Sequence, residues 1–188
     1  KFSNNLNIET FRGSEKDVLE RFYKAAKYFK ADKILRITGD CPLISPKIIN
    51  RLIKYFSTIN IDYAYTSERF AEGLDCEIFT YNALKKTYLS AKKQSEREHI
   101  TQYIKNNPKK FKISSLHNKK DESIYRITVD EKQDFKVVKS IIENFNKKKL
   151  NFYEFDEIKK FLDLNINIKN INKKIMRNQG LYNSLLKD

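Results

Sequence analysis

The sequence predicts an α/β fold, a three-layer α/β/α sandwich around a mainly parallel sheet. Short apolar segments alternate with amphipathic segments of about 10–15 residues, a pattern typical of parallel strands joined by helices. Hydrophobic residues make up 40% of the 188 residues and aromatic residues 13%, which is enough to form a core and excludes a largely disordered chain. Right-handed crossovers then place helices on both faces of the sheet, and ligands bind beyond the carboxyl ends of its strands.

Two amphipathic helices stand out in the first half of the chain. Apolar residues recur at three- and four-residue spacing over 18–29, with Ser14 as the expected N-cap. The same spacing recurs over 46–56, where Ser45 and Pro46 favour a helix start. The strands expected in this half are at 8–11, 33–38, 63–66 and 76–80.

The second half continues the alternation up to Asp163 and then changes in composition. The expected helices are at 82–92, 95–106, 135–145 and 154–162, and the expected strands at 111–116 and 124–129. Beyond Asp163 the chain is rich in Asn, Ile and Lys, with a short helix expected at 176–186. We therefore expect one domain over residues 1–163 and a helical tail or linker over residues 164–188.

The net charge of +14 comes from 38 Lys and Arg against 24 Asp and Glu. A strongly basic chain is one feature of nucleic-acid-binding proteins. The lysines are nevertheless spread along the chain, and the densest short run is at 147–149. Codons for Lys, Asn and Ile are all rich in A and T, so genomic base composition explains the charge without a polyanionic partner. A basic nucleic-acid-binding module is therefore kept only as the last of three alternatives.

Several classes of protein are excluded by what the sequence lacks. No run of about 18 uncharged apolar residues is present, so no transmembrane helix and no membrane partner are expected. Cys41 and Cys76 are too few for a disulfide scaffold and fit a reducing compartment, so we expect a cytoplasmic protein. The four glycines form neither a dinucleotide-binding fingerprint nor a P-loop.

Two carboxylates follow similar segments ninety residues apart. Asp40 ends the segment RITGD and Asp130 ends RITVD, so each stands at the carboxyl end of an expected strand. Mg²⁺ prefers oxygen ligands and is commonly held by one or two carboxylates together with water and phosphate oxygens. The pair therefore indicates a magnesium site, with ordinary turn or N-cap residues as the alternative.

Four ordered blocks of the sequence resemble the acylneuraminate cytidylyltransferase family. The nearest branch is that of the spore coat polysaccharide biosynthesis proteins, and the resemblance covers about residues 8–163. The blocks are RITGDCPL at 36–43, EGLDCEIF at 72–79, SEREHIT at 95–101 and RITVD at 126–130, with Asp134 and Phe135 shortly after, and the segment at 11–23 also resembles that branch.

This resemblance implies a nucleotide-diphospho-sugar transferase fold, related to glycosyltransferase A. It implies transfer of CMP from CTP to a sugar acceptor such as a nonulosonic acid, with release of pyrophosphate, for surface polysaccharide biosynthesis. The acidic residues of the first and last blocks are the Mg²⁺ ligands of the family, and these roles carry over to Asp40 and Asp130. The resemblance also allows a homodimer.

The middle blocks supply candidate contacts to the substrates. Arg97 is a candidate clamp for a carboxylate of the acceptor, and His99 a hydrogen-bond partner or general base, with a structural role as the alternative for His99. Asp75 and Glu72 are candidate contacts to the sugar, and for Asp75 a solvated loop position is equally open. Ser95 and Glu98 together also form a capping-box pattern for a helix.

The family's nucleotide loop, which resembles R-x-G-S-x-R-L-P-G-K, has no match in these residues. Because the chain also begins at Lys1 rather than Met, we expect it to be truncated at its N-terminus, without the first strand and that loop. We therefore expect this chain to be inactive alone. The second alternative is a catalytically degenerate interaction protein of the same fold.

Overall fold

The computed structural model describes residues 2–147, 154–186 and 188. The chain divides into two compact units. Unit 1 comprises Lys1–Ile34, Phe79–Lys112 and Asn178–Asp188, and unit 2 comprises Leu35–Ile78 and Ile113–Arg177. The boundary between the units falls inside two strands, and the predicted boundary between residues 163 and 164 stays a prediction.

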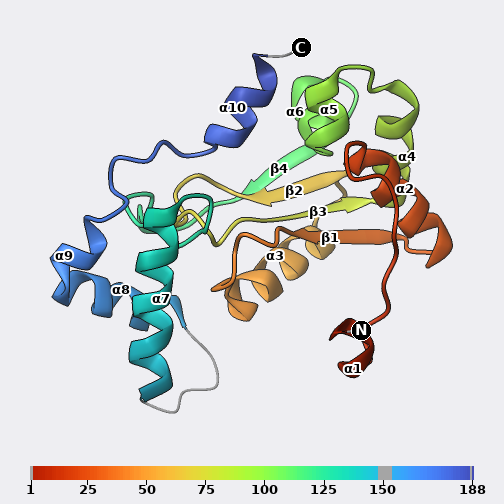
Figure 1. The fold of residues 1–188 in the computed structure, drawn as a ribbon. Coiled ribbons are helices and arrows are strands. Elements are labelled where there is room, and N and C mark those ends of the chain that lie inside the picture. Colours follow the sequence, from red (N-terminus) through yellow and green to blue (C-terminus); the bar gives the residue numbers. More distant parts are fainter. Residues whose placement is uncertain (1, 148–153, 187) are drawn as a thin grey trace. The chain divides into compact units, whose positions relative to one another are not determined.

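A four-stranded sheet in the order β1-β3-β2-β4 confirms the predicted α/β class (Figure 1). β2 and β4 pair in parallel, with Tyr63 opposite Ile113 and Thr66 opposite Leu116. The strands are β1 (Lys33–Ile37), β2 (Tyr63–Thr66), β3 (Cys76–Thr80) and β4 (Ile113–Leu116). The predicted strands at 63–66 and 76–80 are thus confirmed to the residue.

The hydrophobic core of unit 2 lies between this sheet and the helices of the same unit. α3 packs on β2, and the apolar faces of α7 and α8 contribute Ile141, Phe145 and Ile158 to the core. These faces follow from the helical spacing of apolar residues in the sequence. The helices of unit 2 are α3 (Pro46–Thr58), α7 (Lys132–Lys147), α8 (Phe155–Leu164) and α9 (Ile166–Lys169).

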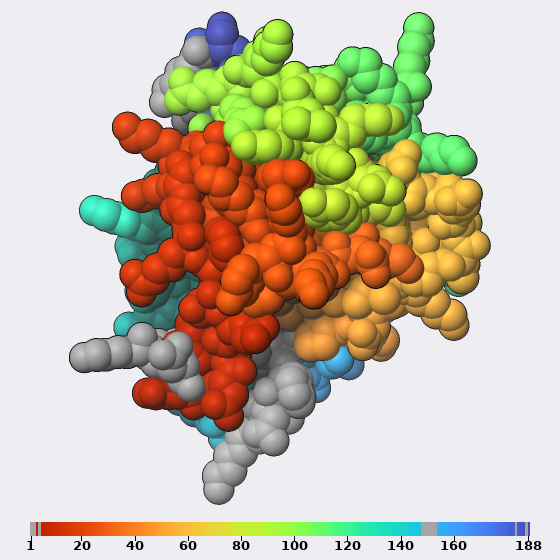
Figure 2. All heavy atoms as spheres, turned by 90° about the vertical axis from the view of Figure 1, so that its right-hand side faces the viewer, coloured from red at the N-terminus to blue at the C-terminus, as the bar shows by residue number. Residues whose placement is uncertain are grey.

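Unit 1 is mainly helical. α2 packs against α4 and α5, and Figure 2 shows its orange-red surface beside the yellow-green surface of α4. Tyr23 of α2 stacks on Tyr88 of α4 with ring centroids 4.3 Å apart. The helices of unit 1 are α1 (Phe2–Asn5), α2 (Val18–Tyr28), α4 (Tyr81–Ser90), α5 (Gln94–Glu98), α6 (Gln102–Asn106) and α10 (Gln179–Leu185). Among the described residues, no helix has the length and hydrophobicity needed to cross a membrane.

Two predicted strands do not form. The segment at 8–11 has no ladder partner in the described part of the chain. The segment at 124–129 makes only one parallel bridge, between Arg126 and Glu72, because its backbone bonds to loops instead of to a strand. The amide of Ile127 donates to the carbonyl of Glu72 at 2.8 Å, and the amide of Val129 donates to the carbonyl of Asp40 at 2.8 Å.

Three local predictions about helices were also wrong. The N-cap of α2 is Asp17, which accepts from the amide of Glu20 at 2.9 Å, whereas Ser14 accepts from the amide of Asp17. The helix expected at 95–106 is broken at His99, whose backbone (ψ 86°) leaves the helical region. Ser95 lies inside α5 and does not cap it, so the predicted capping box is not formed.

Candidate functional site

Two segments of unit 2 that are ninety residues apart in sequence meet at the end of β1. The carbonyl of Asp40 accepts hydrogen bonds from the amide of Val129 at 2.8 Å and from Thr128 Oγ1 at 3.1 Å. Asp130 follows directly after these donors. The structure therefore brings the backbones of the two predicted metal ligands together at one rim of unit 2.

The two carboxylates also interact electrostatically. Burial raises the pKa of Asp130 and the charge of Arg126 lowers it, while the neighbouring charge of Asp40 raises it, and the net shift is upward. The side chain of Asp130 is still 48% exposed, so a ligand has access to it.

Arg126 is the centre of the charged network at this rim. Its side chain is only 7% exposed, and its Nε and Nη2 donate to the two carboxylate oxygens of Asp134, each at 2.8 Å. Nη2 also donates to Asp130 at 2.8 Å, and Nη1 pairs with Glu72 at 2.5 Å. Two buried carboxylates, those of Asp134 and Glu72, thus fix the guanidinium of Arg126, and this guanidinium in turn orients Asp130.

Asp134 is fully buried at the start of α7, and it also binds backbone amides. Its Oδ2 accepts from the amides of Asp130 and Glu131 at 3.2 and 3.0 Å, as an acidic residue in the first turn of a helix does when it reaches back. Burial alone would raise the pKa of Asp134, but hydrogen bonds from Arg126 and Asn172 outweigh it and lower that pKa. Asp134 is therefore ionised and rigidly held.

The loop between β2 and β3 closes over the segment that carries Arg126. Gly73 has φ 100°, and a Cβ at this position would lie 2.6 Å from the amide nitrogen of Thr128. Only glycine allows this approach without strain. The preceding residue, Glu72, is buried, and its carboxylate is engaged by Arg126.

Asp75 is held by one contact within this loop and by one contact with Arg177, which follows α9. Its Oδ2 accepts from the amide of Gly73 at 2.9 Å, and its Oδ1 accepts from Arg177 Nη2 at 2.7 Å. The side chain remains 42% exposed. Asp75 therefore shapes the loop and at the same time faces solvent.

Arg97 and His99 belong to unit 1. Arg97 donates through Nε and Nη2 to Asp17 Oδ2 at 3.0 and 2.5 Å and through Nη1 to the carbonyl of Tyr88, and its guanidinium lies over the Tyr88 ring. His99 is the C-cap of α5. The guanidinium of Arg97 is thus engaged by neighbours within unit 1.

Ser95 and Glu98, the two residues of the expected capping box, bind Asp188 and Ser184 of α10 instead. Ser95 donates through its amide and its hydroxyl to the carboxylate of Asp188, at 2.8 and 2.5 Å. Ser184 of α10 donates to Glu98. This explains why neither Ser95 nor Glu98 takes part in a capping box.

Sequence reasoning assigned no role to Arg126, Asp134, Asn172 or Arg177. Arg126 and Asp134 flank Asp130 at spacings of four residues, and this charge pattern was a signal that could have found them. Asn172 and Arg177 lie in the Asn- and Lys-rich tail, where nothing in the sequence marks them.

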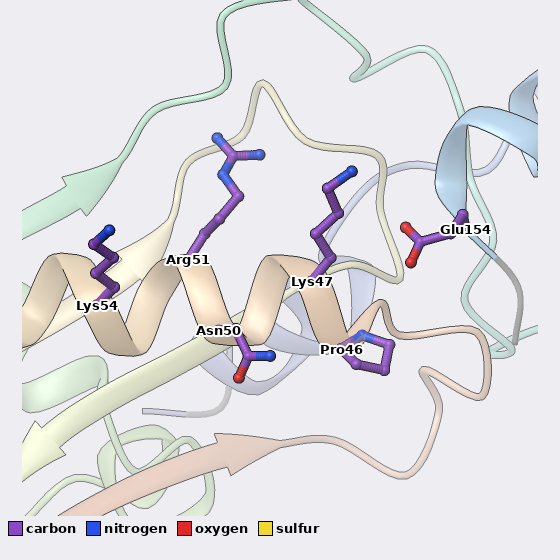
Figure 3. A pocket seen from close by; sticks show the side chains of 6 residues that line it. All are labelled: Pro46, Lys47, Asn50, Arg51, Lys54 and Glu154. Carbon is purple, nitrogen blue, oxygen red and sulfur yellow. The ribbon is translucent and has the colours of Figure 1, made fainter.

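A separate open pocket of about 550 Å³ lies beside α3. Lys47, Arg51 and Lys54 project from one side of the helix, and Glu154 lies across from Lys47 (Figure 3). None of the predicted site residues lines it.

The donor set at the rim fits Mg²⁺. Within residues 2–147, 154–186 and 188, no group of three or more His, Cys, Asp or Glu side chains is arranged to hold a metal ion. Mg²⁺ does not require such a group, because it commonly takes one or two carboxylates and completes its coordination with water and substrate phosphates. Asp40 and Asp130 supply two carboxylates, which is the type and number of protein ligands that this ion commonly takes.

Comparison with known proteins gives consistent matches along nearly the whole chain. A family model described as cytidylyltransferase matches residues 3–179. The chain is similar to the solved structure of a cytidylyltransferase from Leptospira borgpetersenii serovar Hardjo-bovis, with a TM-score of 0.84 and 33% identity, over 93% of this chain and 74% of that one.

Two curated relatives agree with this. Uncharacterized protein MJ1063 of Methanocaldococcus jannaschii is 42% identical over 175 residues, which cover 92% of this chain and 70% of the relative. Spore coat polysaccharide biosynthesis protein SpsF of Bacillus subtilis is 30% identical over 139 residues, which cover 72% of this chain and 58% of the relative. The chain therefore spans 58% to 70% of the length of these two relatives.

Proposed function

The chain belongs to the cytidylyltransferase family, the nucleotidyltransferases that use CTP, and we propose that it takes part in the transfer of CMP from CTP to a sugar. The acceptor class that we propose is a nonulosonic acid, the product a CMP-sugar for surface polysaccharide, and the by-product pyrophosphate. The similarity to the spore coat polysaccharide protein supports this choice of pathway. The observation that carries the proposal is the pair of hydrogen bonds from Thr128 and Val129 to the carbonyl of Asp40.

Asp40 and Asp130 are the proposed ligands of Mg²⁺. When bound, this ion supplies positive charge that neutralises the triphosphate and eases the departure of pyrophosphate. The protein's own contribution is to orient the carboxylate of Asp130 and to fix the backbone that carries Asp40. Arg126 orients Asp130 through its hydrogen bond at 2.8 Å, and Thr128 and Val129 fix the backbone of Asp40. Since phosphoryl transfer depends mainly on positioning and electrostatics, no covalent nucleophile is required.

The contacts to the sugar are assigned to the loop that contains Glu72 and Asp75. Asp75 is the better candidate for direct contact because its carboxylate is partly exposed, whereas Glu72 supports the loop through Arg126. For Arg97 the contacts within unit 1 favour a structural role over that of a clamp for the acceptor. His99 is retained as a candidate contact of the acceptor.

We propose further that the 188 residues alone transfer CMP poorly, because the nucleotide loop of the family has no match among them. The test therefore uses two proteins, the chain as printed and a version extended by any natural sequence that precedes Lys1. Both are incubated with CTP, Mg²⁺ and a panel of sugars that includes nonulosonic acids. Pyrophosphate release and CMP-sugar formation are measured by a coupled assay and by mass spectrometry.

We expect transfer to a nonulosonic acid by the extended version, and about a hundredfold loss or more in Asp40→Asn and Asp130→Asn variants. The matched control is Asp156→Asn, an exposed carboxylate of α8 in the same unit, which should transfer normally. Failure of the extended version to bind CTP at all would overturn the proposed function.

A further inference from the structure

The segment that follows α9 contacts the candidate site from two sides. Asn172 is buried, and its Nδ2 donates to the carbonyl of Arg126 at 3.1 Å and to Asp134 Oδ1 at 2.8 Å. Asp134 in turn holds the guanidinium that orients Asp130. Three hydrogen bonds, between Asn172 and Asp134, Asp134 and Arg126, and Arg126 and Asp130, therefore link Asn172 to a proposed metal ligand.

Arg177 makes the second contact, to the loop between β2 and β3. Its Nη1 donates to the carbonyls of Glu68 and Phe70 at 2.9 and 3.0 Å, and its Nη2 donates to Asp75 Oδ1 at 2.7 Å. One guanidinium thus closes both ends of the loop, while Gly73 seats the middle of the loop against Thr128.

Few other side chains could make the contacts that Asn172 and Arg177 make. Arg177 satisfies three acceptors that point in different directions, which a planar guanidinium with five donors can do and a single ammonium cannot do with the same geometry. Asn172 donates to a carboxylate that already accepts from Arg126 and from two amides, so an acidic residue there would be repelled.

We propose that Asn172 and Arg177 are positioning residues for the transfer reaction, and we name the pair the tail latch. Asn172 steadies the network of Asp134, Arg126 and Asp130, and Arg177 holds the loop that presents Asp75 to the sugar. This inference rests on the proposed function. It gives the segment after α9 a role that its composition does not suggest, and it extends the functional region beyond residue 163.

The test compares Arg177→Met and Arg177→Lys with the matched control Lys174→Met, which removes an exposed charge three residues away. In the form of the protein that transfers CMP, we expect Arg177→Met to raise the KM for the sugar by about tenfold while kcat changes by less than about twofold. Arg177→Lys should recover only part of this loss, and Lys174→Met should match the wild type.

A second readout does not depend on activity. Amide hydrogen exchange should accelerate in the loop at 67–75 of Arg177→Met, and should stay unchanged in α7 and α8. For Asn172→Ala we expect faster exchange at the amides of Asp130 and Glu131, which bind Asp134, and not in the loop at 67–75. The kinetic effect should also differ, because we expect kcat to fall while the KM for the sugar stays nearly constant.

Three outcomes would overturn the latch. One is wild-type kinetics and wild-type exchange in Arg177→Met and Asn172→Ala. Another is exchange that rises uniformly over unit 2, since this would indicate a purely structural role, and the third is full recovery by Arg177→Lys. If the wild type transfers nothing to any sugar, the proposed function fails instead, and the exchange pattern alone then decides whether the latch orders the loop.

Discussion

Two arginines, Arg126 in unit 2 and Arg97 in unit 1, are both held by carboxylates, and they differ in what they leave exposed. Arg126 is 7% exposed and pairs with three carboxylates, one of which, Asp130, remains half-exposed. Arg97 is 23% exposed, pairs with Asp17 and lies over the Tyr88 ring. A site for a ligand needs a carboxylate that is held in place and still accessible, and Asp130, which is 48% exposed, is more accessible than Asp17, which is 31% exposed.

The strongest way to break this comparison is to remove the buried guanidinium. Arg126→Met leaves Asp134 and Glu72 buried without their cation, and we expect a loss of about 3–5 kcal/mol in the free energy of unfolding. Urea denaturation followed by circular dichroism measures this. A loss below about 1 kcal/mol would show that the network contributes little to folding.

The next largest effect on stability is expected at Gly73 of unit 2, for which Gly180 of unit 1 is the comparison. Gly73→Ala places a Cβ 2.6 Å from the amide nitrogen of Thr128 at a φ of 100°, so we expect about 2–4 kcal/mol of destabilisation. Gly180→Ala is the control, because its Cβ would meet no atom within 4 Å, and it should be neutral or stabilising by up to about 1 kcal/mol. Equal melting temperatures for the two variants would contradict the close approach at Gly73.

Arg97→Met tests the arginine of unit 1 in the same way. The pair with Asp17 is partly exposed, so its removal should reduce the free energy of unfolding by only about 1 kcal/mol. Transfer kinetics should change by less than about twofold after correction for the folded fraction. A large rise in the KM for the sugar without a change in stability would instead restore Arg97 as the clamp for the acceptor.

The smallest effect is expected at Asp163, which joins the end of α8 to α9. Hydrogen bonds from Lys169 Nζ at 2.7 Å and from the Tyr125 hydroxyl lower the pKa of Asp163. Since the folded pKa lies below the unfolded value of about 3.9, the stabilisation is present above pH 4 and is lost as the pH falls through the folded pKa. The carboxylate is half-exposed, so the contribution is below about 1 kcal/mol.

The check is the difference in urea midpoint between pH 7 and pH 3 for the wild type and for Asp163→Asn. The variant should lose less stability on acidification than the wild type does. Identical pH profiles would mean that the contact with Lys169 does not stabilise the fold.

Much of the fold could be predicted because its elements carry local patterns. The strands at 63–66 and 76–80 are short segments between loop residues, and the apolar faces of α2, α3 and α7 follow from the three- and four-residue spacing of apolar residues. The segment at 124–129 has the same β-like composition, but its backbone partners are the carbonyls of Asp40 and Glu72, which are distant in sequence. Residue spacing carries no information about such partners, so the predicted strand was wrong.

The residues of the candidate site also fall into those that a local pattern marks and those that only distant contacts reveal. Asp40 and Asp130 could be proposed because each follows a recognisable strand-like segment, and the resemblance to a family assigned them a role. Asn172 and Arg177 could not, because their importance depends on Asp134 and Asp75, which are 38 and 102 residues away in sequence. Long-range hydrogen bonds between polar residues leave no periodic signal.

The central claim is that Asp40 and Asp130 act together on one magnesium–nucleotide complex. Isothermal titration of CTP, with and without Mg²⁺, tests it on the version extended by any natural upstream sequence and on its Asp40→Asn, Asp130→Asn and double variants. We predict that each single variant loses the Mg²⁺-dependent part of its affinity for CTP. The double variant should then bind CTP with the same affinity as the single variant that binds it less tightly. Losses that simply add, or Mg²⁺-dependent binding that survives in the double variant, would contradict a shared ion.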